Sequence, residues 1–293
     1  MSKDSWGRWG ESDERGALNL IGAPQVRKAA ALIDTGEIFP LAQPLSRLTL
    51  VPEHRNPLMH LMNRDGADYA AGAKRPGGFQ FAEDTIVSPL HIGTHLDALC
   101  HAWYDDQLYN GHPSADIRST TGAARCGIDK LGPIVSRGVL FDIVRLRDRP
   151  LEKGEAVTAA DLMAAADGWT IQAGDVALIR TGWQENDGHT ASSFYAGEPG
   201  LDVNAGLWLA EQDVAVVGAD NFAIEVLPNP EGKVFPVHQR LIRDFGVSLL
   251  EGMVLGRLAA AVAKSSHGPF FFAAAPLPIV GGTGSPLTPF AIL

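Results

Sequence analysis

Apolar residues recur along the chain with two spacings, and each spacing predicts a different kind of element. Helical spacing follows Pro24 as far as Ile33, and it returns between Leu201 and Gln212. A further helix is expected from Thr158, because Asp161 three residues later completes a capping pattern. Short apolar or β-branched runs predict strands within residues 38–50, 84–87, 138–144, 174–183, 214–220 and 270–279. Strands interleaved with a few helices indicate an α/β fold.

Length and local composition suggest how this fold is organised. The 293 residues suit a single domain, 1–293, with loop insertions. Residues 1–23 are rich in Gly, Trp and charge and are expected to form an irregular N-terminal extension. Residues 51–81 are polar and rich in Gly and Pro, and so long an irregular segment is usually a functional loop or lid. We therefore expect an active-site loop there, in which His60 and Phe79 can face a substrate.

One short stretch concentrates the reactive side chains. Residues 88–101 hold three histidines, one aspartate and one cysteine behind an apolar run. If the backbone stays extended, His91, His95 and Asp97 share one face, since side chains alternate along a strand. Two imidazoles and a carboxylate suit Zn, Mn or Fe(II) and leave open positions for water and substrate. The stretch therefore predicts a mononuclear metal site.

Charge and cysteine content exclude several classes of function. Lys and Arg number 24 against 34 Asp and Glu, the formal charge is −10, and no basic tract occurs, which argues against nucleic-acid and anionic-membrane partners. No apolar run reaches the roughly 18 residues of a membrane span, and the first residues lack the apolar core of a signal peptide. Two cysteines are too few for a disulfide framework. We expect a soluble, cytoplasmic protein that acts on a small molecule.

The clustered residues also form a motif that resembles a known family signature. Its pattern is His91-x-Gly93-Thr94-His95-x-Asp97-x-x-x-His101. This pattern resembles the signature of the cyclase family of metal hydrolases, which contains bacterial kynurenine formamidase and isatin hydrolase. The resemblance implies a swivelling β/β/α fold, a homo-oligomer that is commonly a dimer, metal ligation by His91, His95 and Asp97, and His101 as the catalytic acid/base. The family usually has Pro two residues after the aspartate, where this chain has Leu99.

Later residues extend the implied site. In the family, a His or Gln near position 238 and a later Glu contribute to the metal site. His238 and Gln239 point about 100° apart on a helix, so one of them faces the metal. We favour His238, because imidazole is the better ligand, and keep Gln239 as the alternate. Glu251 is either a ligand to a second metal or a group that orients an imidazole.

Two more residues are candidates for substrate contact. Trp103 begins a segment that resembles a longer branch of the family. Asp220 follows a predicted strand, and it can form either the outer wall of the site or an ordinary strand-to-loop turn.

The function that these residues imply is metal-dependent hydrolysis of an amide, N-formyl or lactone bond in a small cyclic or aromatic compound. Mn²⁺ or Zn²⁺ would polarise the carbonyl and supply the attacking water, while His101 would act as general acid/base. Two other classes stay open. A two-His, one-carboxylate Fe(II) oxygenase uses the same ligand types, and a non-catalytic metal or small-molecule binding protein can retain them.

Overall fold

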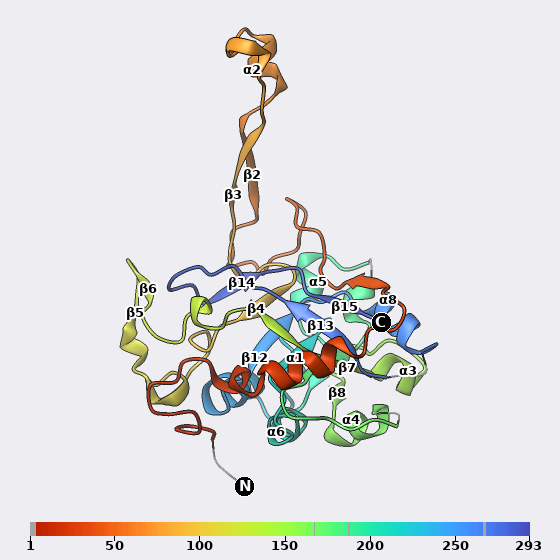
Figure 1. Cartoon of the computed structure of the whole chain (residues 1–293). Helices are drawn as coiled ribbons and strands as arrows, with labels where there is room; N and C mark the ends of the chain where they lie inside the picture. The colour runs from red at the N-terminus through yellow and green to blue at the C-terminus, as the bar shows by residue number, and fades with distance from the viewer. Residues whose placement is uncertain (1–3, 167, 187, 266–267) are drawn as a thin grey trace.

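A nine-stranded, curled mixed sheet forms the centre of the protein (Figure 1). The computed structural model describes residues 4–166, 168–186, 188–265 and 268–293. Across the sheet the strands are β1 (Ile38–Pro40), β15 (Phe290–Ile292), β13 (Phe270–Ala274), β7 (Ile134–Asp142), β9 (Val176–Arg180), β11 (Val216–Ala219), β12 (Ser248–Glu251), β4 (His95–Asp97) and β14 (Gly284–Pro286). The middle four, β7, β9, β11 and β12, are parallel, and the flanking strands pair antiparallel.

The parallel strands lie in the core because they are apolar along their whole length. Every residue of β11 is buried, as are the first four of β9, which is the pattern of strands covered on both faces. Helix α1 (Ala23–Ala30) packs on β7 and β13, whereas α4 (Ala159–Ala165) contacts β7, α3 (Ile143–Arg147) and α6 (Val203–Glu211). Other short elements are α5 (Ala191–Tyr195), α7 (Pro236–His238), α8 (Gly256–Val262), the pair β8 (Ala156–Val157) and β10 (Gly200–Leu201), and the pair β5 (Ile117–Arg118) and β6 (Gly122–Ala123).

Local signals placed most of these elements correctly. The predicted helices correspond to α1, α4 and α6, and the strands expected near 138–144, 174–183 and 214–220 are β7, β9 and β11. Thr158 caps α4: its side chain accepts from the Asp161 amide at 3.2 Å, and the Thr158 amide donates to Asp161 at 2.9 Å. Residues 38–50 were expected to contain several strands, but only Ile38–Pro40 forms one, since prolines remove ladder donors. Among the described helices, none has the length and apolar composition that crossing a bilayer requires.

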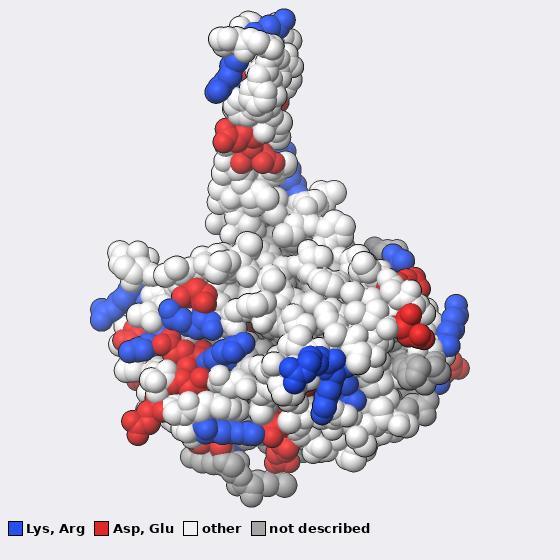
Figure 2. Space-filling view, viewed as in Figure 1, with Lys and Arg blue, Asp and Glu red and all other residues white. Residues whose placement is uncertain are grey.

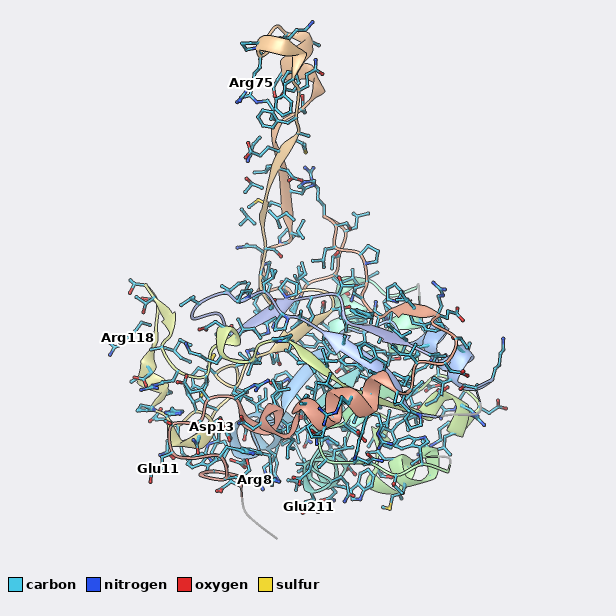
Figure 3. The ribbon with its side chains drawn as sticks, viewed as in Figure 1. Arg8, Glu11, Asp13, Arg75, Arg118 and Glu211 are labelled. Carbon is cyan, nitrogen blue, oxygen red and sulfur yellow. The ribbon has the colours of Figure 1, made fainter. Side chains whose placement is uncertain are left out.

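The predicted loop over residues 51–81 is instead mostly a protruding arm. Strand β2 (Met59–Arg64) pairs antiparallel with β3 (Glu83–Val87), and α2 (Gly66–Ala70) lies beyond their ends, so that the arm projects from the body (Figure 1). Figure 3 labels Arg75 at the far end of the arm, where its guanidinium carbon lies 5.0 Å from the centre of the Phe81 ring. Strand β3 matches the strand predicted within residues 84–87, whereas β2 lies in the segment expected to be irregular. Nearly all residues of β2 are exposed, so its sequence lacks the alternation of a half-buried strand.

The N-terminal segment is irregular, as expected, but it is attached to the body. A 3₁₀ helix at Gly16–Leu20 buries Leu18 completely. Asp13, labelled in Figure 3, accepts hydrogen bonds from the Gly16 amide at 2.9 Å and from the Tyr109 hydroxyl at 3.1 Å. The segment therefore covers the region that immediately follows residues 88–101.

Candidate metal centre

The pairing of strands β4 and β12 brings the first two side chains of the site together. These strands run antiparallel and place His95 directly opposite Glu251, although 156 positions separate them in the sequence. His95 Nε2 lies 3.1 Å from Glu251 Oε2. On the other side of β4, Asp97 pairs with Gly284 of β14. Strand β4 therefore presents His95 and Asp97 within the sheet, where both are buried.

A bend, rather than an extended strand, adds His91 to this face. Only His95–Asp97 is strand, and Gly93 has a φ of +55°, so the expectation of extended backbone from His91 onward is wrong. The bend returns the ring toward the strand, where His91 Nδ1 lies 2.7 Å from Asp97 Oδ1. Gly284 makes room for it, because a Cβ at that position would lie 2.6 Å from His91 Cε1. The structure brings the three side chains together, but along a bent backbone path rather than an extended one.

Asp97 is the centre of the cluster. Its Oδ1 lies 2.7 Å from His91 Nδ1 and 3.7 Å from His95 Nε2, while its Oδ2 lies 3.8 Å from the Nε2 atoms of both His101 and His238. Oδ2 is buried and has no hydrogen-bond partner among the described residues. A buried carboxylate oxygen left unpaired among imidazole nitrogens is the position that a divalent cation would satisfy. The donor set therefore fits a metal ion.

His238 comes from α7 and is held by a second buried carboxylate. Its Nδ1 lies 2.7 Å from Glu225 Oε1 and its Nε2 lies 3.0 Å from Glu251 Oε1. Glu225 also accepts from the amides of Val237 and His238 at 3.1 and 3.0 Å. Gln239 turns away and donates to the Val234 carbonyl. Of the two alternates, the structure places His238 at the cluster.

Two overlapping sets of ligand atoms are close enough to hold an ion. Within the described residues these are His91, Asp97 and His101 in one group, and His95, Asp97 and Glu251 in the other. Asp97 belongs to both groups. Its two carboxylate oxygens can therefore each bind one of two metal ions, or a single ion can occupy either group. The rings of His91 and His101 stack with centres 4.0 Å apart.

Burial and neighbouring charges set the protonation states at the centre. Burial would raise the pKa of Asp97, but the surrounding His101 and His91 outweigh it and lower that pKa well below the usual range. Burial lowers the pKa of His101 to about 4, against the attraction of Asp97. His101 is therefore a neutral imidazole at physiological pH, able to accept a proton.

A narrow cavity of about 30 Å³ adjoins the cluster. His91 and His95 form part of its wall, and the other side chains include Arg55, Gln184, Phe194, Tyr195 and Phe222. Arg55 and Gln184 carry no local sequence signal, because they reach this cavity from segments far from the motif. The cavity is where a reacting group would meet the metal ligands.

The four predicted substrate-contact residues lie elsewhere. Trp103 is 42% exposed, Phe79 stacks on Phe81 in the arm, and His60 on β2 lies 2.6 Å from Asp84. Asp220 is fully buried and accepts from the Thr181 amide and hydroxyl and the Gly182 amide at 2.6–2.8 Å. Asp220 thus forms the turn that was its alternative interpretation. None of the four lines the cavity that the described residues enclose.

Comparisons with known proteins relate the chain to a family. The model of the Cyclase family matches residues 39–226. A structure described as a novel cyclase is 39% identical, covers 100% of both chains and superposes with a TM-score of 0.93. Among curated proteins, none matches.

More distant structures share the fold. Isatin hydrolase A from Ralstonia solanacearum is 22% identical over 87% of this chain and 91% of its own, with a TM-score of 0.62. A predicted metal-dependent hydrolase from Bacillus stearothermophilus is 21% identical over 87% and 97%, with a TM-score of 0.55. These likenesses confirm the expected α/β, cyclase-like fold. Because the family model covers more than half of the chain and the 39% identical cyclase covers all of it, this chain belongs to the Cyclase family.

Proposed function

We propose that the protein is a metal-dependent hydrolase that cleaves an amide, N-formyl or lactone bond in a small cyclic or aromatic compound. The observation that carries this proposal is the buried, unpaired oxygen of Asp97, surrounded by imidazole nitrogens and adjoining a cavity. Related structures described as isatin hydrolase and metal-dependent hydrolase support it.

The residues divide into those that hold the ion and those that handle protons. His91, His95 and Asp97 would hold it, with Glu251 and His238 completing the set. Zn²⁺ or Mn²⁺ suits these nitrogen and oxygen donors, and such an ion supplies Lewis-acid polarisation of a carbonyl and a lowered pKa for water.

We assign the proton transfer to His101. Its ring is partly buried and neutral, stacked on His91 at the edge of the cluster. It can take a proton from the attacking water and pass it to the leaving nitrogen or oxygen. Glu225 fixes the orientation of His238 by binding its Nδ1, so that Nε2 points toward Glu251 and Asp97.

A hydrolysis screen tests the proposal. Protein stripped with a chelator and then supplied with Mn²⁺ or Zn²⁺ would be assayed against N-formyl aromatics, cyclic imides and lactones. We expect turnover of at least one class, lost on stripping and restored by metal. Failure with every class and metal would favour a binding protein, whereas bound iron with oxygen uptake would favour an oxygenase; either result contradicts the proposal.

We also propose that the protein assembles as a homodimer through its arm. A two-stranded hairpin is marginally stable alone in water, yet the arm exposes large apolar side chains on both faces. These are Met59, Leu61, Met62, Phe79, Ile86 and Val87, each 47–62% exposed. At its base lies an apolar groove of about 630 Å³ whose wall includes Leu58, Leu277 and Leu287.

Charge supports a second copy as the occupant. The arm, residues 59–87, carries three basic and four acidic residues, whereas the whole chain has a net charge of −10. Figure 2 shows few charged side chains on the visible surface between the arm and the lower body. Two copies therefore meet with little repulsion if each arm crosses the other's groove about a two-fold axis.

Substitutions on one face of the arm test this assembly. Leu61→Asp combined with Val87→Asp should convert a species of twice 31.2 kDa into a 31.2 kDa monomer, measured by light scattering after gel filtration. Both residues are exposed, so the fold of the body should persist. Met163→Asp, at an equally exposed position on α4, is the matched control and should remain dimeric. A monomeric wild-type protein at micromolar concentration would rule the assembly out.

A further inference from the structure

Arg55 is a half-buried cation that lacks a carboxylate partner. It lies between β1 and β2, and its Nη1 donates to the His91 carbonyl at 2.5 Å. Its guanidinium carbon lies 5.6 Å from the centre of the Phe222 ring. Within the described residues no Asp or Glu forms an ion pair with it, and none lines the cavity that it faces. Most donors of this guanidinium are therefore available to a ligand.

Aromatic rings form the wall around Arg55. Phe194, Tyr195 and Phe222 all line the cavity, and successive ring centres lie 5.0 and 4.7 Å apart at steep angles. The Tyr195 hydroxyl donates to the Leu50 carbonyl at 2.8 Å, so its polar end is already paired. The wall thus offers apolar ring faces and edges, which suit a flat, unsaturated ligand.

Gln184 adds an acceptor beside the same cavity. It lines the cavity, and its Oε1 is buried without a hydrogen-bond partner among the described residues. A buried acceptor left unpaired is costly, and a ligand N–H would satisfy it. His91 and His95 form the wall toward the metal centre.

We infer that this cavity selects a planar substrate that carries a carboxylate or similar anion, bound by Arg55, together with an N–H directed at Gln184. A guanidinium pairs with a carboxylate through two parallel hydrogen bonds, which an ammonium group cannot reproduce. The inference rests on the proposed hydrolase function and narrows it. An amide or N-formyl compound offers the N–H, whereas a lactone does not.

Entry of such a ring requires movement at one wall. The cavity measures only about 30 Å³, well below the roughly 150 Å³ of an engineered protein cavity that binds benzene. Residues 43–58, which carry Leu50 and Arg55, contain no helix or strand. This segment can therefore move outward at lower cost than the sheet on the other side.

A binding experiment tests the role of Arg55 without requiring turnover. Benzoate and its neutral counterpart benzamide would be titrated into the metal-loaded protein by calorimetry, and the metal content of each sample would be measured. We expect wild-type protein to bind benzoate at least about tenfold more tightly than benzamide. Arg55→Met should reduce this preference to less than about twofold with benzamide affinity unchanged, and Arg55→Lys should give an intermediate preference.

A matched control comes from the same segment. Arg47→Met removes an exposed arginine that donates to the His60 carbonyl and does not line the cavity, so the preference should persist. Arg55 contacts the His91 carbonyl, so Arg55→Met could lose metal. In that case the preference for benzoate is compared between wild type and Arg55→Lys, and a weaker preference in Arg55→Lys supports the role of Arg55.

The possible outcomes separate this inference from the proposed function. No preference in wild type, or a full preference in Arg55→Met, would overturn the role of Arg55 even if metal-dependent hydrolysis is observed. An Arg55-dependent preference in a protein that shows no metal-dependent hydrolysis would instead support anion recognition and contradict the hydrolase.

Discussion

Asp97→Asn is expected to abolish metal binding and hydrolysis while leaving the protein folded. The substitution keeps the shape of the side chain but removes the charge, and Asp97 is the one residue common to both ligand groups of the described chain. Loss of an outer partner alone typically lowers metal affinity about 10- to 100-fold, so loss of a shared ligand should cost at least as much. Elemental analysis and thermal unfolding of the purified variant measure the two effects.

The control for this variant is another buried aspartate. Asp175 is 2% exposed and pairs with Arg137 at 2.6 Å on a different part of the sheet. Asp175→Asn should lower stability yet bind metal as wild type does. Full metal content and activity in Asp97→Asn would show that the ion, if any, is bound elsewhere.

His101→Ala should produce the opposite combination, with metal retained and turnover lost. The ring is at the edge of the cluster, and three other histidines with Asp97 and Glu251 remain to hold the ion. Loss of a general acid/base typically lowers kcat about 10²- to 10⁴-fold. Steady-state kinetics on the substrate found in the screen measures the loss of kcat, and metal analysis of the same sample measures the metal that is retained.

His112 offers a comparable histidine outside the centre. Its Nε2 lies 3.2 Å from the Asp13 carbonyl oxygen, in the region covered by the N-terminal segment. His112→Ala should keep kcat within a few-fold of wild type. If His101→Ala behaves in the same way, His101 has no part in proton transfer.

Local patterns predicted what local interactions determine. The cap at Thr158, the apolar stripe of α6 and the continuous apolar runs of β9 and β11 were all readable, because each depends on neighbours a few residues apart. The candidate ligands that the structure brings together were also visible in the sequence, since His91, His95 and Asp97 lie within seven positions.

The features of the site that the sequence did not reveal depend on contacts between distant segments. Glu251 reaches His95 only because β12 pairs with β4, and Arg55 reaches the cavity from the segment that leads into the arm. The choice between His238 and Gln239 depended on which side of α7 packs against Glu225. Strand β3 of the arm was predicted within residues 84–87, but β2 was missed because it buries little and so lacks the alternation that marks a half-buried strand.

Anomalous X-ray diffraction from crystals grown with Mn²⁺ or Zn²⁺ tests the central claim most directly. The account predicts a strong peak about 2.0–2.2 Å from a carboxylate oxygen of Asp97 and from an imidazole nitrogen of the cluster. A second peak that shares Asp97 would indicate two ions. Fully loaded, active protein whose anomalous peak lies away from Asp97 would contradict the account.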